Sequence, residues 1–424
     1  MSLTRTILSD FRDSSVADWP NISVPERAAW IVFCFACVQS AFLAPYIVLI
    51  PHEQSKLFSG VVCAAALLSA WVAQIRRTTR LKLSEVAVSA TLAVLAILSA
   101  RLSATPETAS ARTFVVLASG LGGFWCARIL MVSDTTRRFF RSYCFIILAL
   151  VLALCGVSYA LRGNIYELLD TNPHPLADRI LLLWFAPLAL LLDKRVTARL
   201  ASWFLMIVSY MVFYLMALRS LLLTPAALAV VVLCSRVLRV KSVLLICAAI
   251  ALSVAYYLAT APMDKQFKPG AIPIFYRIEN YSFSLHIALK RPLLGIGLTS
   301  PRDAFLEDYS IKYPGITKEQ FAAEVKRVRV SENLFLTFLA ELGVPFLLLY
   351  TFAIGTIFVR LIHMTIQAGA TAPALHPLAL LLPLLGALIH YMVWDGPLHP
   401  QSSWFFHLLL GLAAGSWDES LAKK

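Results

Sequence analysis

The sequence predicts an all-α polytopic membrane protein with about 12 transmembrane helices and one large, partly helical outer loop. Hydrophobic residues make up 59% of the 424-residue chain, charged residues make up 14%, and the mean hydropathy is +0.75. Soluble domains are less apolar, with about 45–50% apolar and about 25% charged residues. Apolar runs of about 17 to 25 residues, the length of a membrane-spanning helix, recur through almost the whole chain. These runs lack the alternation of a membrane β-barrel, so we expect helices to satisfy the backbone hydrogen bonds.

The predicted spans divide the chain into regions. Residues 1–28 form a polar tail without the basic and apolar parts of a secretion signal, and we expect this tail in the cytoplasm. Residues 29–260 carry roughly nine spans, and residues 261–332 form the outer loop. Residues 333–417 carry roughly three more spans, and a cytoplasmic tail follows at 418–424. The spans are expected at residues 29–50, 57–75, 83–100, 112–131, 139–161, 180–192, 199–218, 221–239, 242–260, 333–359, 374–394 and 401–417.

The distribution of Lys and Arg predicts the orientation of the chain. Strongly basic short loops, such as 76–82 and 135–141, alternate with acidic or balanced segments such as 162–179. Because Lys and Arg favour the cytoplasmic side, the basic loops are expected inside and the 261–332 loop outside. That loop contains 11 Lys or Arg and 8 Asp or Glu, although loops of this length translocate largely regardless of charge. A cationic outer surface indicates an anionic ligand, such as lipid phosphates or lipid-linked pyrophosphates.

Arg219 lies between two apolar spans that are joined by almost no loop. Its guanidinium group is therefore expected at or just under the outer membrane interface. One interpretation is an interfacial arginine that extends its charge toward water. The other is a phosphate clamp, because the planar fork of N–H donors binds phosphate with two hydrogen bonds and a charge at this depth is costly unless it is used.

The outer loop contains one predicted helix, from about Ile278 to Lys290, which Pro292 ends. Arg277 stands at its start, and Lys290 and Arg291 stand at its end. Cations at the last turn of a helix are favourable in any protein, so these residues have a structural interpretation beside the anion-binding one. The Gly-Ile-Gly sequence that follows is by itself a weak signal.

The segment "SENLFL" begins the tenth predicted span. Ser331 or Asn333 is suited to cap the helix that follows, and Glu332 favours its positive end. The alternative is that the Glu332 carboxylate serves as a general base on a sugar hydroxyl. The cations just before it are Lys326, Arg327 and Arg329.

Asp395 and His399 form the last outer turn of the chain, in the sequence "WDGPLHPQ". One interpretation places both side chains in solvent. The other places them in the same outer cavity as Glu332, where a carboxylate and an imidazole would contact the substrate.

These segments, in this order, resemble the O-antigen ligase family and its relatives, the O-antigen polymerases and the bacterial O-oligosaccharyltransferases. In that family an arginine after a middle span precedes a periplasmic loop with an R-x-x-x-aromatic pattern, and then a proline with two spaced glycines. A His-Asn pair then leads into "xxLxxLxELGxxG". The matching residues here are Arg219, Arg277, Tyr281, Pro292, Gly295, Gly297, Asn333, Leu336, Leu339, Glu341, Leu342 and Gly343. This chain departs from the pattern with Glu332 in place of the histidine and Tyr281 in place of the commoner tryptophan.

The resemblance implies an enzyme of lipopolysaccharide biosynthesis in the bacterial inner membrane, with its active site facing the periplasm. Such a glycosyltransferase moves O-antigen glycan from undecaprenyl pyrophosphate to the lipid A core oligosaccharide. Glu332 would be the base, while Arg219 and Arg277 would neutralise the pyrophosphate. Donor and acceptor are anionic lipids, so the lipid bilayer is a partner and nucleic acid is not. The outer loops contain no clustered carboxylates of the kind that hard cations need, so we expect a metal-independent transfer without a cofactor. Direct displacement at the donor sugar, assisted by the base, would invert its anomeric centre.

Two alternatives stay open at this stage. An O-antigen polymerase or a protein O-oligosaccharyltransferase would share the same motifs and differ in its acceptor. A lipid-glycan flippase or transporter belongs to another class, and it would line a path at the middle of the membrane with charged residues. The spans contain few charged residues in the sequence, which favours the enzyme.

Overall fold

The computed structural model describes residues 23–42, 52–75, 81–170, 172–191, 196–216, 273–298, 333–367, 375–392 and 394–422. Within these ranges every regular element is a helix and no strand is present. The predicted spans at 221–239 and 242–260 lie outside them. The helices are α2 (Val24–Phe42), α3 (His52–Ile75), α4 (Leu83–Arg101), α5 (Pro106–Leu130), α6 (Asp134–Arg162), α7 (Pro173–Leu183), α8 (Phe185–Leu191), α9 (Val196–Leu215), α14 (Pro273–Lys290), α17 (Leu334–Leu342), α18 (Val344–Gln367), α19 (Pro377–Tyr391), the 3₁₀ helix η2 (Gly396–Leu398) and α20 (Pro400–Ala422).

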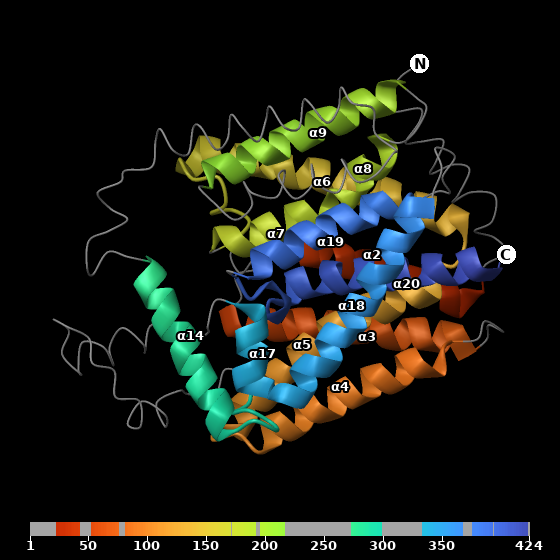
Figure 1. Cartoon of the computed structure of the whole chain (residues 1–424). Helices are drawn as coiled ribbons and strands as arrows, with labels where there is room; N and C mark the ends of the chain where they lie inside the picture. The colour runs from red at the N-terminus through yellow and green to blue at the C-terminus, as the bar shows by residue number, and fades with distance from the viewer. Residues whose placement is uncertain are drawn as a thin grey trace.

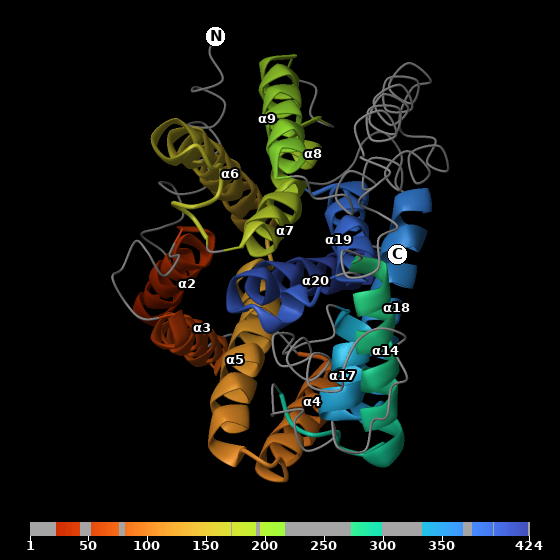
Figure 2. The same cartoon turned by 90° about the vertical axis from the view of Figure 1, so that its left-hand side faces the viewer.

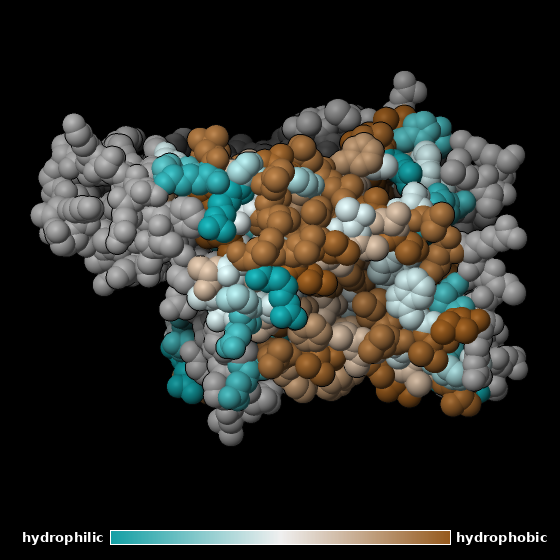
Figure 3. Space-filling view, turned by 90° about the horizontal axis from the view of Figure 1, so that it is seen from below, coloured by the Kyte–Doolittle hydropathy of each residue, from teal (hydrophilic) through white to brown (hydrophobic). Residues whose placement is uncertain are grey.

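Seven helical segments in the described part of the chain are long and apolar enough to cross a membrane. They are Gln54–Ile75, Leu83–Arg101, Pro106–Leu130, Asp134–Arg162, Pro173–Leu191, Thr197–Leu215 and Val344–Gln367. Helix α4 buries little of its surface, and Val94, Ile97 and Leu98 are among its exposed side chains. Figure 3 shows a broad apolar face of the molecule. A face of this kind is expected to contact lipid, so the chain is an all-helical, multi-pass membrane protein.

Helix α20 lies at the centre of the bundle (Figure 2), with α2, α3 and α5 on one side and α7 and α19 on the other. Small residues bring it close to α5. A Cβ atom on Gly123 would lie 3.1 Å from the Leu408 amide nitrogen, and one on Gly411 would overlap the Phe124 carbonyl oxygen. Glycine therefore allows the two backbones to approach, which is the usual way that helices pack in membranes.

The structure corrects the prediction that a span begins at residue 180. Helix α7 begins at Pro173, and both Asp178 and Arg179 are fully buried within it. The Arg179 guanidinium donates to the carbonyl oxygens of Ala41 and Pro175, each at 3.0 Å, and it forms an ion pair with Asp170. The prediction was wrong because these partners satisfy a charge that would otherwise be too costly to bury.

The structure also corrects the single span predicted at 333–359. Two helices, α17 and α18, meet there at Gly343, whose φ angle is +86°. A Cβ atom at Gly343 would lie 2.5 Å from the Leu293 carbonyl carbon, so the chain bends where another segment packs against it. The break divides the apolar run into a short helix at one end of the bundle and a long spanning helix (Figure 1).

Candidate functional site

Helix α14 lies beside α17 at one end of the bundle (Figures 1 and 2). It covers the predicted 278–290 helix and begins earlier, at Pro273. Its buried residues Phe283 and Ile287 form a small apolar cluster with Ile296 and with Ala340 of α17. This packing fixes the part of α14 that follows Arg277.

The Pro-Leu-Leu-Gly-Ile-Gly and Glu-Leu-Gly motifs form one structural unit, which we call the glycine clamp (residues 292–297 and 340–344). The Val344 amide donates to the Pro292 carbonyl oxygen at 2.7 Å, and the Gly297 amide donates to the Glu341 carbonyl oxygen at 2.9 Å. Gly295 has a φ angle of +61°, and a Cβ atom there would lie 2.6 Å from the Ala340 carbonyl oxygen. Glycine is therefore needed for both the backbone conformation and the close approach.

Tyr281 and Asn333 bind the same backbone group. The Tyr281 hydroxyl donates to the Met392 carbonyl oxygen at 3.2 Å, and the Asn333 side-chain amide donates to that oxygen at 2.9 Å. The Asn333 carbonyl oxygen also accepts from the Leu336 amide at 3.1 Å, so Asn333 is the N-cap of α17, as one reading of the sequence predicted. The Met392 carbonyl thus joins α14, α17 and the turn that follows α19.

That turn holds Asp395 and His399. The Asp395 carboxylate is almost completely buried, which contradicts the solvated interpretation for this residue, whereas 26% of the His399 side chain is exposed. The His399 Nε2 atom lies 3.7 Å from Asp395 Oδ1. The His399 ring stacks on Trp394, with ring centroids 4.8 Å apart.

Sequence reasoning missed a further group of residues beside this turn. The His174 ring also stacks on Trp394, with ring centroids 4.7 Å apart, and the His390 ring stacks on His174 at 5.2 Å. We call the four rings His399, Trp394, His174 and His390 the ring stack. The Asp178 carboxylate lies 3.5 Å from His390 Nε2, so the ring stack has a carboxylate at each end. The spacing of His174 and Asp178, one helical turn apart, was the available signal.

The remaining predicted site residues are placed as follows. Lys290 and Arg291 are exposed at the end of α14. Arg277 belongs to α14, but its side chain lies outside the description. Arg219, Lys326, Arg327, Arg329 and Glu332 lie outside the described residues. Within the described ranges, no three His, Cys, Asp or Glu side chains are placed to hold a metal ion together.

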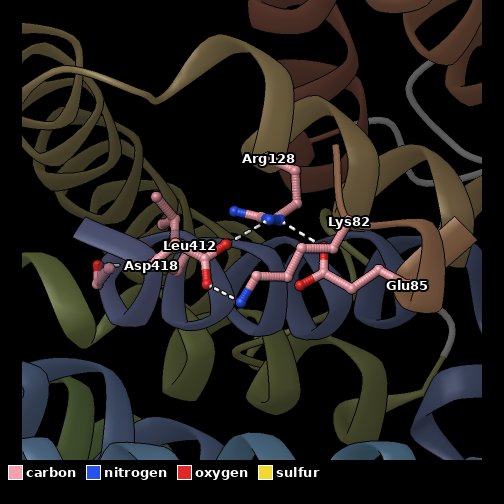
Figure 4. A network of polar contacts seen from close by, with 6 residues as sticks. Lys82, Glu85, Arg128, Leu412 and Asp418 are labelled. Atoms are coloured by element: carbon pink, nitrogen blue, oxygen red, sulfur yellow. Dashed lines mark hydrogen bonds and ion pairs between the residues drawn. The ribbon is translucent and has the colours of Figure 1, made fainter. Parts of the chain in front are cut away.

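A second polar cluster lies near the other end of α20 (Figure 4). The Arg128 guanidinium, from α5, donates to Glu85 of α4 at 2.9 Å and to Asp418 of α20 at 2.7 Å. Lys82 forms an ion pair with the second Asp418 oxygen. The two cations and two carboxylates balance, so this cluster holds three helices together and presents no unmatched charge for chemistry.

No known protein-family model matches the sequence, and no curated protein matches it significantly. The function is therefore inferred from the residues at the α14 end of the bundle. This end combines buried carboxylates, several imidazoles, an aromatic surface and hydrogen-bond donors. Such a set suits the transfer of protons to and from a bound substrate.

Proposed function

We propose that the protein is a glycosyltransferase that moves O-antigen glycan from undecaprenyl pyrophosphate to the lipid A core oligosaccharide. In this proposal the chain has about 12 spans, lies in the bacterial inner membrane and works at the periplasmic face. The observation that supports it most is the shared Met392 carbonyl oxygen. It joins the helix that contains Arg277, the cap residue that follows Glu332 in the sequence, and the turn of Asp395 and His399.

The reaction is a direct displacement at the anomeric carbon of the donor sugar. The acceptor hydroxyl oxygen forms the new bond to that carbon, and the bond from the carbon to the pyrophosphate oxygen breaks, which inverts the configuration. Glu332 accepts the hydroxyl proton. Arg219 and Arg277 neutralise the charge that develops on the departing pyrophosphate, and Lys290 and Arg291 add positive charge at the end of α14.

The test measures transfer from a purified lipid-linked glycan to lipid A core in membranes. Arg277→Ala and Arg219→Ala are each expected to abolish transfer, and lysine should rescue them only partly because it lacks the two-donor fork. Glu332→Gln is expected to lower turnover by at least about 100-fold. Arg138→Ala is the matched control, because Arg138 is an exposed arginine in a predicted cytoplasmic segment. Normal transfer by the three variants at matched membrane levels would refute the proposed function.

The choice of acceptor separates this function from its nearest alternatives. A polymerase would extend a second lipid-linked glycan, and a protein O-oligosaccharyltransferase would modify a serine of a protein acceptor. Accumulation of product on lipid A core, with neither of the other acceptors modified, identifies the ligase.

The position of the ring stack argues against a flippase or transporter. Asp178 and Arg179 do add charge within a span, which the sequence interpretation did not expect. Asp178 lies only about 7.5 Å from the start of a 19-residue segment that is about 28 Å long. Charges that bind a transported substrate are expected near the middle of the membrane, so a cluster at one end favours chemistry at a membrane face.

A further inference from the structure

Helix α14 leaves a row of leucines exposed, opposite to the side that packs on α17. The exposed fractions are 47% for Leu285, 82% for Leu289 and 70% for Leu293, which we call the leucine row. Phe283 and Ile287, in contrast, are buried in the apolar cluster with α17. The leucines are four residues apart, so Leu285 and Leu289 share one side of the helix and Leu293 follows just after its end. Burial of a leucine side chain is worth about 1.5–3 kcal/mol, so the row indicates a further partner.

The leucine row lies at the level where two membrane-spanning segments end. Pro292, which is part of the glycine clamp, accepts a hydrogen bond from the Val344 amide, and Val344 is the first residue of the α18 span. On the other side of the clamp, the Glu341 carbonyl oxygen accepts from the Ser99 hydroxyl at 2.8 Å, close to the end of the α4 span. The end of α14 is thus fixed to two spans at their ends, which places the row at the surface of the membrane.

Helix α14 runs across the end of the bundle. In Figure 1 it lies at a steep angle to α3 and α20, and it is seen from the side in Figure 2 as well. A helix with this orientation, at the end of the membrane spans, lies along the membrane surface. Helices of this kind insert an apolar side into the boundary between headgroups and acyl chains, and they carry Lys and Arg beside it.

The cations expected of such a helix stand within the leucine row. Lys290 and Arg291 are exposed and lie between Leu289 and Leu293. From residue 280 to residue 298 the sequence contains these two cations and no Asp or Glu. Long basic side chains at a membrane surface keep their apolar stems against the acyl region and their charge beside lipid phosphates. The charge of this segment is therefore complementary to an anionic lipid surface.

We propose that the C-terminal half of α14 docks on the bilayer surface and binds anionic phospholipid. The leucine row enters the acyl region, and Arg291 binds a lipid phosphate, with Lys290 beside it. A lipid surface fits this face better than a second copy of the chain, because the equivalent face of a second copy carries the same positive charge. The docking requires no catalysis, so it is tested independently of the proposed glycosyl transfer.

The test places a fluorescent reporter at residue 289 of the full chain, in vesicles of phosphatidylcholine and phosphatidylglycerol in equal amounts. Leu289→Cys is labelled with an environment-sensitive fluorophore, and the wild-type protein, labelled in parallel, gives the background from the native cysteines. A quencher attached to lipid acyl chains is expected to act strongly at residue 289, and iodide in the water only weakly. Glu167→Cys is the matched control, since Glu167 is exposed in the segment between α6 and α7, and it should show the reverse.

Two results of this measurement would overturn the proposal. Iodide quenching at residue 289 as strong as at residue 167 would show that the leucine row lies in water. Weak quenching by both reagents would show that protein covers the row, either another segment of this chain or a second copy.

The lipid phosphate is tested by adding Arg291→Gln to the Leu289→Cys variant. The acyl quencher is carried either by phosphatidylglycerol or by phosphatidylcholine, and the ratio of the two signals gives the enrichment of phosphatidylglycerol beside residue 289. This enrichment should fall by up to about fivefold, which corresponds to about 1 kcal/mol for one cation near an anionic surface, and high salt should also lower it. Arg138→Gln, at an exposed arginine of α6 in a predicted cytoplasmic segment, should leave it unchanged. Equal enrichment with and without Arg291 would overturn the assignment of anionic lipid to this face.

Discussion

Gly295 gives the sharpest test of the glycine clamp, because the chain contains a second glycine with nearly the same backbone angle and no crowding. The φ angle is +61° at Gly295 and +65° at Gly163, which ends α6. A Cβ atom at Gly295 would overlap the backbone of Glu341 and lie 2.6 Å from the Ala340 carbonyl oxygen. At Gly163, nothing lies within 4 Å of such an atom. The two alanine variants therefore share the conformational penalty and differ only in the steric clash.

The expected losses of unfolding free energy follow from these two terms. An alanine in the left-handed region costs about 1–2 kcal/mol, which is the full expectation for Gly163→Ala. Gly295→Ala adds an overpacking penalty of about 1–3 kcal/mol, because the crowded atoms are backbone atoms of α17 that cannot rotate away. A third variant, Gly355→Ala, lies in α18 with nothing within 4 Å of the new Cβ atom. It should gain about 0.5–1 kcal/mol, as expected for alanine in a helix interior.

The measurement is unfolding of the three purified variants in the same detergent, followed by circular dichroism, together with transfer activity in membranes. We expect stability to rank Gly355→Ala above Gly163→Ala above Gly295→Ala. Transfer should fall only in Gly295→Ala, since α14 is then displaced from α17. Equal stability and activity of Gly163→Ala and Gly295→Ala would show that the close approach of the two motifs does not exist.

Three further outcomes follow from the structure. Asn333→Asp keeps the helix cap and loses the amide donor to Met392, whereas Asn333→Ala loses both interactions. The free energy of unfolding should therefore fall by about 1 kcal/mol in the aspartate variant and by about 2 kcal/mol in the alanine variant. Equal losses in the two variants would contradict the double role of Asn333. Arg128→Met removes the cation that pairs with both Glu85 and Asp418, and it should lower the free energy of unfolding by about 3 kcal/mol. Lys82→Met, at a more exposed side chain, should lower it by under about 1 kcal/mol in the same unfolding assay. In the proposed reaction arginine, and no metal ion, neutralises the pyrophosphate, so transfer should continue in excess EDTA. A requirement for added magnesium or manganese would contradict this part of the proposal.

Part of the candidate site could be predicted from local sequence. Asn333 is a helix cap because its short amide reaches a free backbone N–H one turn ahead, and this requires no knowledge of the rest of the fold. The helix of α14 ends as expected, just before Pro292, because proline has no amide hydrogen to continue the helical bonds. The association of His174 with His390 and Trp394 was not predictable in this way. These residues lie on separate helices and turns, and only the packing of α7 against α19 and the turn before α20 brings their rings together.

The sequence by itself determined that the chain is built from apolar helices. A membrane span is specified by the length and the apolar composition of a segment, and both can be read from the sequence. Only the tertiary structure decided which polar residues could enter those helices. Asp178 and Arg179 appeared to belong to an outer segment, yet Arg179 is buried because the Ala41 carbonyl oxygen and the Asp170 carboxylate receive its hydrogen bonds. Whether a charge is buried depends on partners that are distant in sequence, and folding alone brings those partners into contact.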